Sequence, residues 1–271
     1  HMYPLGMTGA PFANPYPVSN GTADGTNRDV SADSRMDELI QWIPYLESLH
    51  ISAIYIGPLF ESSTHGYDTR DFRLIDRRLG TNVSFRSFVD CCHEHGIRVV
   101  VDGVFNHTGS QSLYFNDDGF YPTLGAAQSQ DSPYYDWFSF HPWPREYDAW
   151  WGIRTLPAVR EESPGYVDYI IENENSIIRR WLRAGASGWR LDVADELPDW
   201  FIEKLRAAVE ETDPEAILIG EVWEHASTKI AYSQRRRYLQ GKELHGVMNY
   251  PFRTSLLAYL QAVSYTHLRA H

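Results

Sequence analysis

Acidic residues recur at three places where an apolar run ends. Residues 102–107 read DGVFNH, residues 188–192 read GWRLD and residues 220–223 read GEVW, and each segment follows or contains β-branched, apolar residues. Parallel strands end at a common edge of their sheet, so acids at three successive strand ends are expected to build one pocket from distant parts of the chain. Carboxyl groups attack as nucleophiles and exchange protons. The three segments therefore predict a site of carboxylate chemistry.

In this order, the three segments resemble the first, second and third signature regions of the α-amylase family of retaining glycoside hydrolases (glycoside hydrolase family 13). One such segment would be weak support, but three in the right order rarely arise by chance. Residues 66–69, GYDT, and residues 156–157, Leu-Pro, are softer matches. The Leu-Pro segment resembles the family's fifth region, which usually continues with Leu-Asn where this chain has Val159-Arg160. The resemblance runs from about residue 5 to about residue 259.

The resemblance implies three catalytic residues. A retaining glycosidase places two carboxyl groups at about 5 Å across the glycosidic bond, one as nucleophile and one as acid/base. By the match, Asp192 is the nucleophile and Glu221 the acid/base. Arg190 lies two positions before Asp192, so both side chains point into one interior, and the guanidinium is expected to lower the pKa of Asp192. Apolar neighbours are expected to raise the pKa of Glu221.

The resemblance also assigns sugar-binding residues. Asp102 is expected to brace Arg190 at the base of the pocket. His107 is expected to hydrogen-bond the sugar at the cleavage position, and Tyr67 to stack beneath that sugar. Asp68 is a further hydroxyl partner.

Other candidates lie on the side of the leaving group. Asp195 and Glu196 follow the nucleophile, where family members contact the leaving sugar. Trp223, together with Trp150 and Trp151, is expected to contact sugar rings, because indole faces pack against them.

Each of these residues has a simpler structural interpretation. Asp102 and Arg190 could form only a buried ion pair, and Tyr67 could be a core aromatic. Asp195 or Glu196 could cap a helix. The shared order of the segments favours function for the catalytic residues, and the alternatives stay open for the others.

Composition favours a neutral ligand. The chain has 271 residues, of which 43% are hydrophobic, enough for one large domain with a loop excursion. Its net charge of −12 argues against nucleic-acid and anionic-membrane partners. Nine Trp and 17 Tyr suit an oligosaccharide or polysaccharide.

Few features indicate a cellular location. Cys91 and Cys92 are adjacent on an expected helix and point apart, so no disulfide framework is expected. No membrane span or signal peptide is recognisable. A cytoplasmic location is therefore the expectation, although the leading His-Met resembles a tag remnant and leaves the native start open.

The alternation of strands and helices predicts an α/β fold of the (β/α)8 TIM-barrel type. Only about six strand–helix units can be placed, so the barrel is expected to be incomplete. Pro44 predicts a kink or late start in the first helix, Ser84 opens the next and Gly96 ends it. The expected strands are 5–13, 53–56, 97–101, a strand ending at 192, 217–220 and 246–250, and the expected helices are 34–49, 84–95, 167–184, 198–211 and 252–263.

Residues 108–160 break this alternation. They hold thirteen Phe, Tyr and Trp residues, too many for a disordered linker. The resemblance implies an excursion, called domain B in the family, that walls the substrate cleft; a small aromatic core of its own is the alternative. The domain divisions are thus 1–107 for the first part of the barrel, 108–160 for the excursion, 161–262 for the rest of the barrel and 263–271 for a tail.

The family's last signature, a His-Asp pair after the seventh strand, has no counterpart in this sequence. Residues 263–271 resemble translated sequencing adaptor, as in metagenomic assemblies, so we expect a C-terminally truncated chain with a non-native tail. Three hypotheses follow: a retaining α-glucan or α-glucoside hydrolase with transglycosylation as a sister activity, an inactive or carbohydrate-binding fragment, and a homo-oligomer that covers the open barrel edge.

No cofactor is expected to be required. Many family members hold calcium through the Asn matched here by Asn106, with oxygen ligands from the excursion. Calcium needs about six to eight oxygens. Asp117, Asp118 and Asp131 are candidate ligands, although solvated surface acids are the simpler interpretation.

Overall fold

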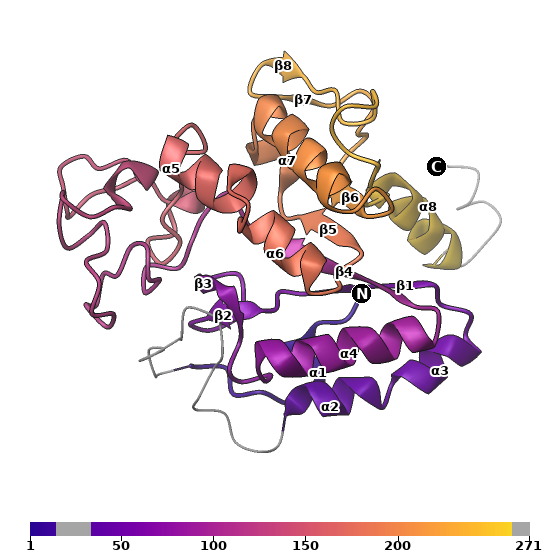
Figure 1. Ribbon diagram of the computed structural model, residues 1–271. Coiled ribbons are helices and arrows are strands. Elements are labelled where there is room, and N and C mark those ends of the chain that lie inside the picture. Colours follow the sequence, from indigo (N-terminus) through magenta and orange to yellow (C-terminus); the bar gives the residue numbers. More distant parts are fainter. Residues whose placement is uncertain (15–33, 262–271) are drawn as a thin grey trace.

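The computed structural model describes residues 1–14 and 34–261. A five-stranded parallel sheet lies at its centre (Figure 1). Met2 adds a single parallel bridge to Ile56 at one edge. In spatial order the strands are β1 (Ala53–Ile56), β4 (Arg98–Gly103), β5 (Gly188–Leu191), β6 (Ile217–Gly220) and β9 (Gly246–Val247). The described strands thus form an open sheet of the barrel type, as the sequence predicts.

The expected first strand is wrong. Residues 4–7 form the short helix α1 (Pro4–Met7), and only Met2 joins the sheet. Proline suits the first turn of a helix, where its missing N–H is not needed. The strands expected at 53–56 and 217–220 have the predicted bounds.

Helices before β4 cover one face of the sheet. The expected helix 34–49 is divided into α2 (Arg35–Ile40) and α3 (Ile43–Ser48), with Pro44 in the first turn of α3. Helix α4 (Asn82–Glu94) begins two residues before Ser84, because Thr81 and Ser84 cap each other's backbone N–H groups. Gly96 follows α4 with a left-handed φ of 69°.

The single helix expected over 167–184 is wrong. The structure has α5 (Pro164–Val167), a π-helical turn (Asp168–Glu172) and, after a break, α6 (Ile177–Arg183). Asn173 causes the break locally, since its Oδ1 accepts the N–H of Asn175 in place of a helical bond. Helix α7 (Asp199–Thr212) agrees with the prediction within one residue.

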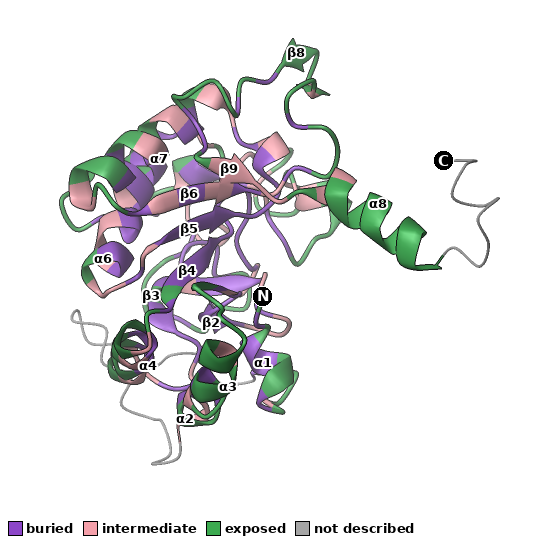
Figure 2. Cartoon of the chain, turned by 90° about the vertical axis from the view of Figure 1, so that its right-hand side faces the viewer, coloured by how far each residue is buried: buried purple, intermediate pink, exposed green. Residues whose placement is uncertain are grey.

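Helix α8 (Tyr250–Gln261) differs from the other long helices. Figure 2 shows buried faces on α4, α6 and α7 toward the sheet, whereas α8 is exposed along almost its whole length. Phe252 is 63% and Leu260 67% exposed. The expected tail 263–271, and most of the polar loop before α2, lie outside the described residues.

Two hairpins were not predicted. Strands β2 (Phe60–Ser62) and β3 (Thr69–Ile75) pair antiparallel, and β7 (Ile230–Ala231) and β8 (Gln234–Arg235) form a short second hairpin. The segment between β2 and β3 carries Tyr67 and Asp68. The first hairpin thus positions two predicted site residues.

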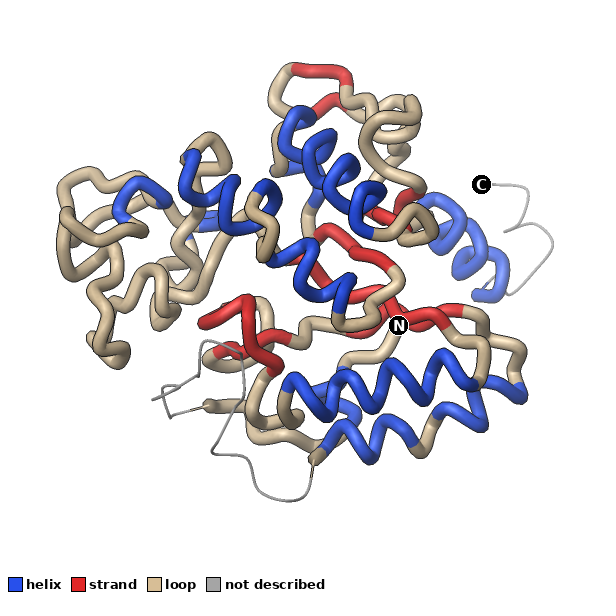
Figure 3. Tube along the Cα trace, viewed as in Figure 1, coloured by secondary structure: helices blue, strands red, loops and turns tan. Residues whose placement is uncertain are grey.

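Residues 108–160 are almost entirely loop (Figure 3). Two short 3-10 turns (Tyr135–Trp137 and Trp150–Gly152) are the helical elements in this segment. Tyr114, Phe115 and Trp137 are buried, and Tyr114 stacks on Trp137 at 5.1 Å. All three belong to the main hydrophobic core, and Tyr114 also stacks on Phe72 of β3 at 5.7 Å, so the excursion packs against the barrel part. No helix within residues 1–14 and 34–261 combines the length and apolar character that crossing a membrane requires.

Candidate active site

Three carboxylates converge on one guanidinium. Arg190 Nη1 lies 2.8 Å from Asp102 Oδ1 and 2.8 Å from Asp192 Oδ1, and its Nη2 lies 2.8 Å from Glu221 Oε2. Arg190, Asp102 and Asp192 are 4%, 0% and 6% exposed. The structure thus brings together the acids of all three sequence segments in a nearly water-free cluster.

The strand register explains this convergence. Asp102 pairs directly with Arg190 across β4 and β5. Side chains two apart on a strand share a face, which puts Asp192 beside Arg190. The N–H of Glu221 donates to the carbonyl of Leu191 at 2.9 Å, so the pairing continues past the end of β6. The acids meet because their strands end together.

Asp102 forms the floor of the cluster. Its Oδ2 accepts a 2.6 Å hydrogen bond from the hydroxyl of Tyr55, and the Arg190 guanidinium lies over the Tyr55 ring at 5.2 Å. Burial raises the pKa of Asp102, while Arg190 opposes that shift. Tyr55 was not singled out from the sequence, where it is one residue of a buried strand.

Asp192 departs from the expected electrostatics. Burial, with the neighbouring charges of Asp102 and Glu221, raises its pKa to about 7, although Arg190 lowers it. The lowered pKa expected from Arg190 alone is therefore wrong. One guanidinium serves three carboxylates, and it does not offset their desolvation and mutual repulsion.

Glu221 also departs from expectation. Its Oε2 accepts the N–H of Val193 at 3.0 Å, and its Oε1 accepts the hydroxyl of Tyr250 at 2.9 Å. Burial favours the neutral form, but Arg190 and these hydrogen bonds outweigh it and lower the pKa. The raised pKa of Glu221 expected from its apolar neighbours is wrong, because a guanidinium and hydrogen-bond donors also contact the carboxylate.

Val193 holds a strained conformation to make this contact. Its φ is 39°, a left-handed value that is exceptional for a β-branched residue. Such strain concentrates at functional sites, where the surrounding structure enforces it. Here it directs the Val193 N–H at Glu221.

His107 and Tyr67 lie together at the pocket. His107 Nε2 lies 3.0 Å from the carbonyl oxygen of Tyr67, and its ring lies 5.3 Å from that of Trp150. Burial lowers the pKa of His107 to about 4, so the ring is neutral at pH 7. The pKa of Tyr67 is raised by burial and by the charges of Asp102 and Asp192, which places this hydroxyl near the acids.

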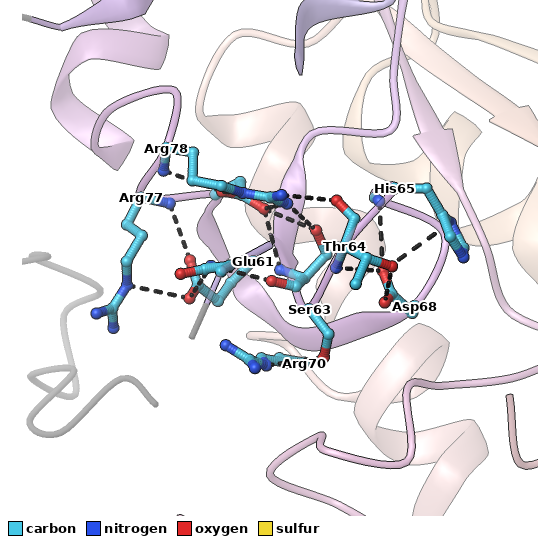
Figure 4. A network of polar contacts seen from close by, with 12 residues as sticks. Glu61, Ser63, Thr64, His65, Asp68, Arg70, Arg77 and Arg78 are labelled. Carbon is cyan, nitrogen blue, oxygen red and sulfur yellow. Dashed lines mark hydrogen bonds and ion pairs between the residues drawn. The ribbon is translucent and has the colours of Figure 1, made fainter. Parts of the chain in front are cut away.

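Asp68 does not have the expected free carboxylate. Thr64 donates its N–H to Oδ1 at 3.1 Å and its hydroxyl to Oδ2 at 2.6 Å, and Gly66 N–H lies 3.3 Å from Oδ1. Arg78 holds the carbonyl of Thr64 from the other side (Figure 4). Asp68 therefore shapes the turn that presents Tyr67, and its assignment as a further hydroxyl partner of the sugar stays a prediction.

Asp195 is likewise occupied by the protein. Its Oδ1 accepts the hydroxyl of Tyr238 at 2.6 Å, and its Oδ2 lies 2.9 Å from Lys229 Nζ. These contacts hold the segment after β6 in place, and the contact of Asp195 with the leaving sugar stays a prediction.

Glu196 and Trp223 both contact Trp151 of the excursion, and so join residues 108–160 to the strand ends. The indole N–H of Trp151 donates to Glu196 Oε1 at 2.8 Å. Trp151 stacks on Trp150 at 5.0 Å and meets the ring of Trp223 edge to face at 5.7 Å. Trp151 is 66% and Trp223 39% exposed, so both keep surface for a sugar ring.

Asn106 makes a hydrogen bond through its amide nitrogen but has none at its amide oxygen among the described residues. Its Nδ2 donates to the backbone carbonyl of Asp192 at 3.1 Å, while its buried Oδ1 has no partner among the described residues. Asp117, Asp118 and Asp131 are exposed. Over residues 1–14 and 34–261, no three His, Cys, Asp or Glu side chains gather as a metal would require.

Comparison with known proteins agrees with this geometry. The family described as "Alpha amylase, catalytic domain" matches residues 16–270. An amylopullulanase of Thermoanaerobacterium saccharolyticum is 37% identical over 242 residues, 82% of this chain and 18% of that protein. A cyclomaltodextrinase of Thermoanaerobacter pseudethanolicus is 36% identical over 81% of this chain and 36% of its own length.

Solved structures show the same likeness. The type III pullulan hydrolase from Thermococcus kodakarensis superimposes with a TM-score of 0.67 at 34% identity, over 78% of this chain and 35% of that one. The Nostoc punctiforme debranching enzyme gives 0.70 at 33% identity, over 82% and 44%. The chain spans well under two thirds of the length of these relatives. With its family match, fold and clustered acids, the chain belongs to the α-amylase family of glycoside hydrolases.

Proposed function

We propose that this chain carries the nucleophile and the acid/base of a retaining α-glycoside hydrolase acting on α-glucans, maltooligosaccharides or α-glucosides. The convergence of Asp192 and Glu221 on Arg190 carries this proposal. Relatives named amylopullulanase, cyclomaltodextrinase and maltogenic amylase support an α-glucan as the substrate class.

The proposed reaction has two steps. Asp192 attacks the anomeric carbon to form a glycosyl ester, while the leaving oxygen takes a proton from Glu221. Glu221 then takes a proton from water, whose oxygen attacks the same carbon and releases Asp192. A sugar hydroxyl in place of water gives transglycosylation.

The first step requires a change at Glu221. Three donors, from Arg190, Val193 and Tyr250, hold it as a carboxylate in this structure. We infer that substrate entry breaks the pair with Arg190, so that Glu221 takes up a proton. Arg190 then pairs with Asp102 and Asp192 only, which favours the ionised form of the nucleophile Asp192.

Two alternatives rest on specific features. The absent His-Asp pair supports an inactive or carbohydrate-binding fragment, because loss of one electrostatic partner commonly costs about 100-fold or more in rate. The exposed apolar side chains of α8 support a homo-oligomer, for which light scattering on the eluted protein would give the mass of more than one chain. Neither alternative involves nucleic acid or a membrane surface, and a cytoplasmic location stays a prediction.

Calcium is a separate matter. We propose that the reaction needs no resident metal, although Asn106 Oδ1 has no partner in the described part of the chain. Dialysis against EDTA should leave sugar release unchanged. Loss of activity that calcium restores would contradict this proposal.

Sugar release from maltooligosaccharides tests the proposed function. The parent chain and Asp192→Asn are compared at equal concentration, because the substitution keeps the side-chain shape and removes the nucleophile. Release by the parent alone supports hydrolysis at this site. Equal release by both proteins contradicts it, and negligible release by both favours the binding fragment.

A further inference from the structure

A second hollow lies outside the carboxylate cluster. A groove of about 550 Å³ separates the first turn of α7 from the β7–β8 hairpin, which lies near it in Figure 1. This volume is in the usual range for small-molecule sites. Its wall includes Glu196, Asp199, Trp200, Tyr232, Arg236 and Arg237, and we call it the α7 groove.

Two aromatic rings face solvent in the α7 groove. Trp200 is 39% exposed and Tyr232 is 73% exposed. Tyr232 and Ser233 form the two-residue turn of the hairpin, with φ values of 52° and 62°. Turns of this kind favour Asn-Gly, since both positions need a left-handed backbone.

Tyr232 is therefore energetically unfavourable in this turn. A bulky residue with positive φ is strained, and its exposed ring gains little packing in return. Glycine would satisfy the turn without strain. The residue type at this position is thus unexplained by folding alone and indicates a surface role for the ring.

The charges of the α7 groove are paired with each other. Arg236 Nε lies 2.7 Å from Asp199 Oδ1, and Arg237 Nε lies 3.5 Å from Asp199 Oδ2. The guanidinium of Arg236 also donates to the backbone carbonyls of Asp195 and Leu197. Paired charges offer hydrogen bonds but attract no ion strongly, so the groove suits a neutral, hydroxyl-rich ligand.

The α7 groove is also linked to the aromatic residues near Glu221. Glu196 lines the groove and accepts the hydrogen bond of Trp151, whose ring meets Trp223. Trp223 follows Glu221 by two residues. A glucan held beside Glu221 thus has a continuous polar and aromatic path toward Trp200 and Tyr232.

We propose that the α7 groove is a second carbohydrate-binding site for a glucosyl unit of a maltooligosaccharide, with Tyr232 and Trp200 stacking on the sugar. The identity of the ligand rests on the proposed function. Glu196 and Arg237 are the hydrogen-bonding groups.

Calorimetric titration with maltoheptaose and with maltose tests this site. Every protein carries Asp192→Asn, so that no sugar is consumed. Tyr232→Gly and Trp200→Ala should each weaken maltoheptaose binding about tenfold, while Tyr259→Ala, an exposed tyrosine change on α8, should alter it less than twofold. Maltose is too short to reach from the carboxylate cluster to the α7 groove, so it should bind every protein more weakly than maltoheptaose binds the Asp192→Asn parent.

Tyr232→Gly separates binding from folding. Because glycine relieves the strained turn, this variant should melt at the same or a higher temperature than its parent while binding maltoheptaose more weakly. Unchanged maltoheptaose affinity in both groove variants, or no measurable binding to the parent, would overturn the proposal.

The groove and the proposed reaction can fail independently. Sugar release by the protein with Asp192 intact reports on the reaction. Comparison of the groove variants with their Asp192→Asn parent reports on the groove, because the residues of the carboxylate cluster are the same in all of these proteins. Release without a groove effect rejects the second site only, and a groove effect without release rejects hydrolysis only.

Discussion

Arg190 and Glu221 form an ion pair with 2.8 Å between Nη2 and Oε2. This contact joins the expected acid/base to the cation that the nucleophile also needs. Because Arg190 stabilises the carboxylate form of Glu221, the ligand-free site holds the group as a base, and its pKa is lowered. Asp192, more deeply buried, has the raised pKa instead. In the proposed reaction, substrate therefore redistributes charge around Arg190 before the first step.

Tyr250→Phe tests the hydroxyl that Glu221 accepts. The bond stabilises the ionised carboxylate, so its removal should raise the pKa of Glu221. The kcat/KM profile reports the free enzyme, in which Glu221 has the lower pKa of the two acids. The acidic limb of the profile therefore follows Glu221 and should move to higher pH, by about half a unit or more.

A leaving group that needs no proton provides the control. The rate with an α-maltosyl fluoride should change less than the rate with maltooligosaccharides. Tyr259→Phe, on the exposed part of α8, should leave both rates and the pH profile unchanged. An unshifted acidic limb in Tyr250→Phe would contradict the role given to this hydroxyl.

Asp192→Asn should alter the pH dependence of stability. An acid with a raised folded-state pKa holds its proton in the native state but loses it in the unfolded chain. The parent should therefore lose stability as pH rises from about 4 to about 7, between the unfolded and folded pKa values of Asp192.

Urea unfolding at pH 4 and pH 8 measures this effect. One pKa unit corresponds to about 1.4 kcal/mol, and the advantage of Asp192→Asn over the parent should grow by at least about that amount from the lower to the higher pH. Exposed Asp131→Asn is the matched control and should show no such growth. An equal difference in unfolding free energy between Asp192→Asn and the parent at both pH values would contradict the raised pKa of Asp192.

Gly57→Ala should disturb the floor of the site. A Cβ at Gly57 would lie 2.4 Å from the Cβ of Asp102, within the buried contact to Tyr55 and Arg190. Overpacking of this kind costs about 1–3 kcal/mol of stability, and displaced Asp102 should lower kcat more than KM. Gly246→Ala, where no atom lies within 4 Å, should be tolerated; wild-type kcat and melting temperature in Gly57→Ala would be the contrary result.

The sequence predicts the convergence of Asp102, Asp192 and Glu221 because strand order and two-residue periodicity determine where parallel strand ends point. It does not reveal Tyr55 or Tyr250, since each reaches an acid through a contact between distant segments. Asp68 and Asp195 are held by partners that the pattern does not show. Thr64, four residues before Asp68 in the β2–β3 hairpin, contacts the first, and Lys229 with Tyr238 contacts the second.

The pKa directions predicted for Asp192 and Glu221 are wrong for a different reason. The expected pKa directions considered Asp192 with Arg190, and Glu221 with its apolar neighbours, as separate pairs. In the structure a single guanidinium contacts three acids, and the most buried acids carry the largest cost of ionisation. Only the three-dimensional count of charges around Arg190 gives the observed directions.

Covalent trapping tests the central claim most directly. The chain is incubated with a 5-fluoro-α-glucosyl fluoride, whose good leaving group permits glycosylation while the ring fluorine slows release, and the digest is analysed by mass spectrometry. We predict one fluoroglucosyl adduct on the peptide that contains Asp192, and none in Asp192→Asn. An adduct on another residue, or sugar release by the parent without any adduct at Asp192, would contradict the account.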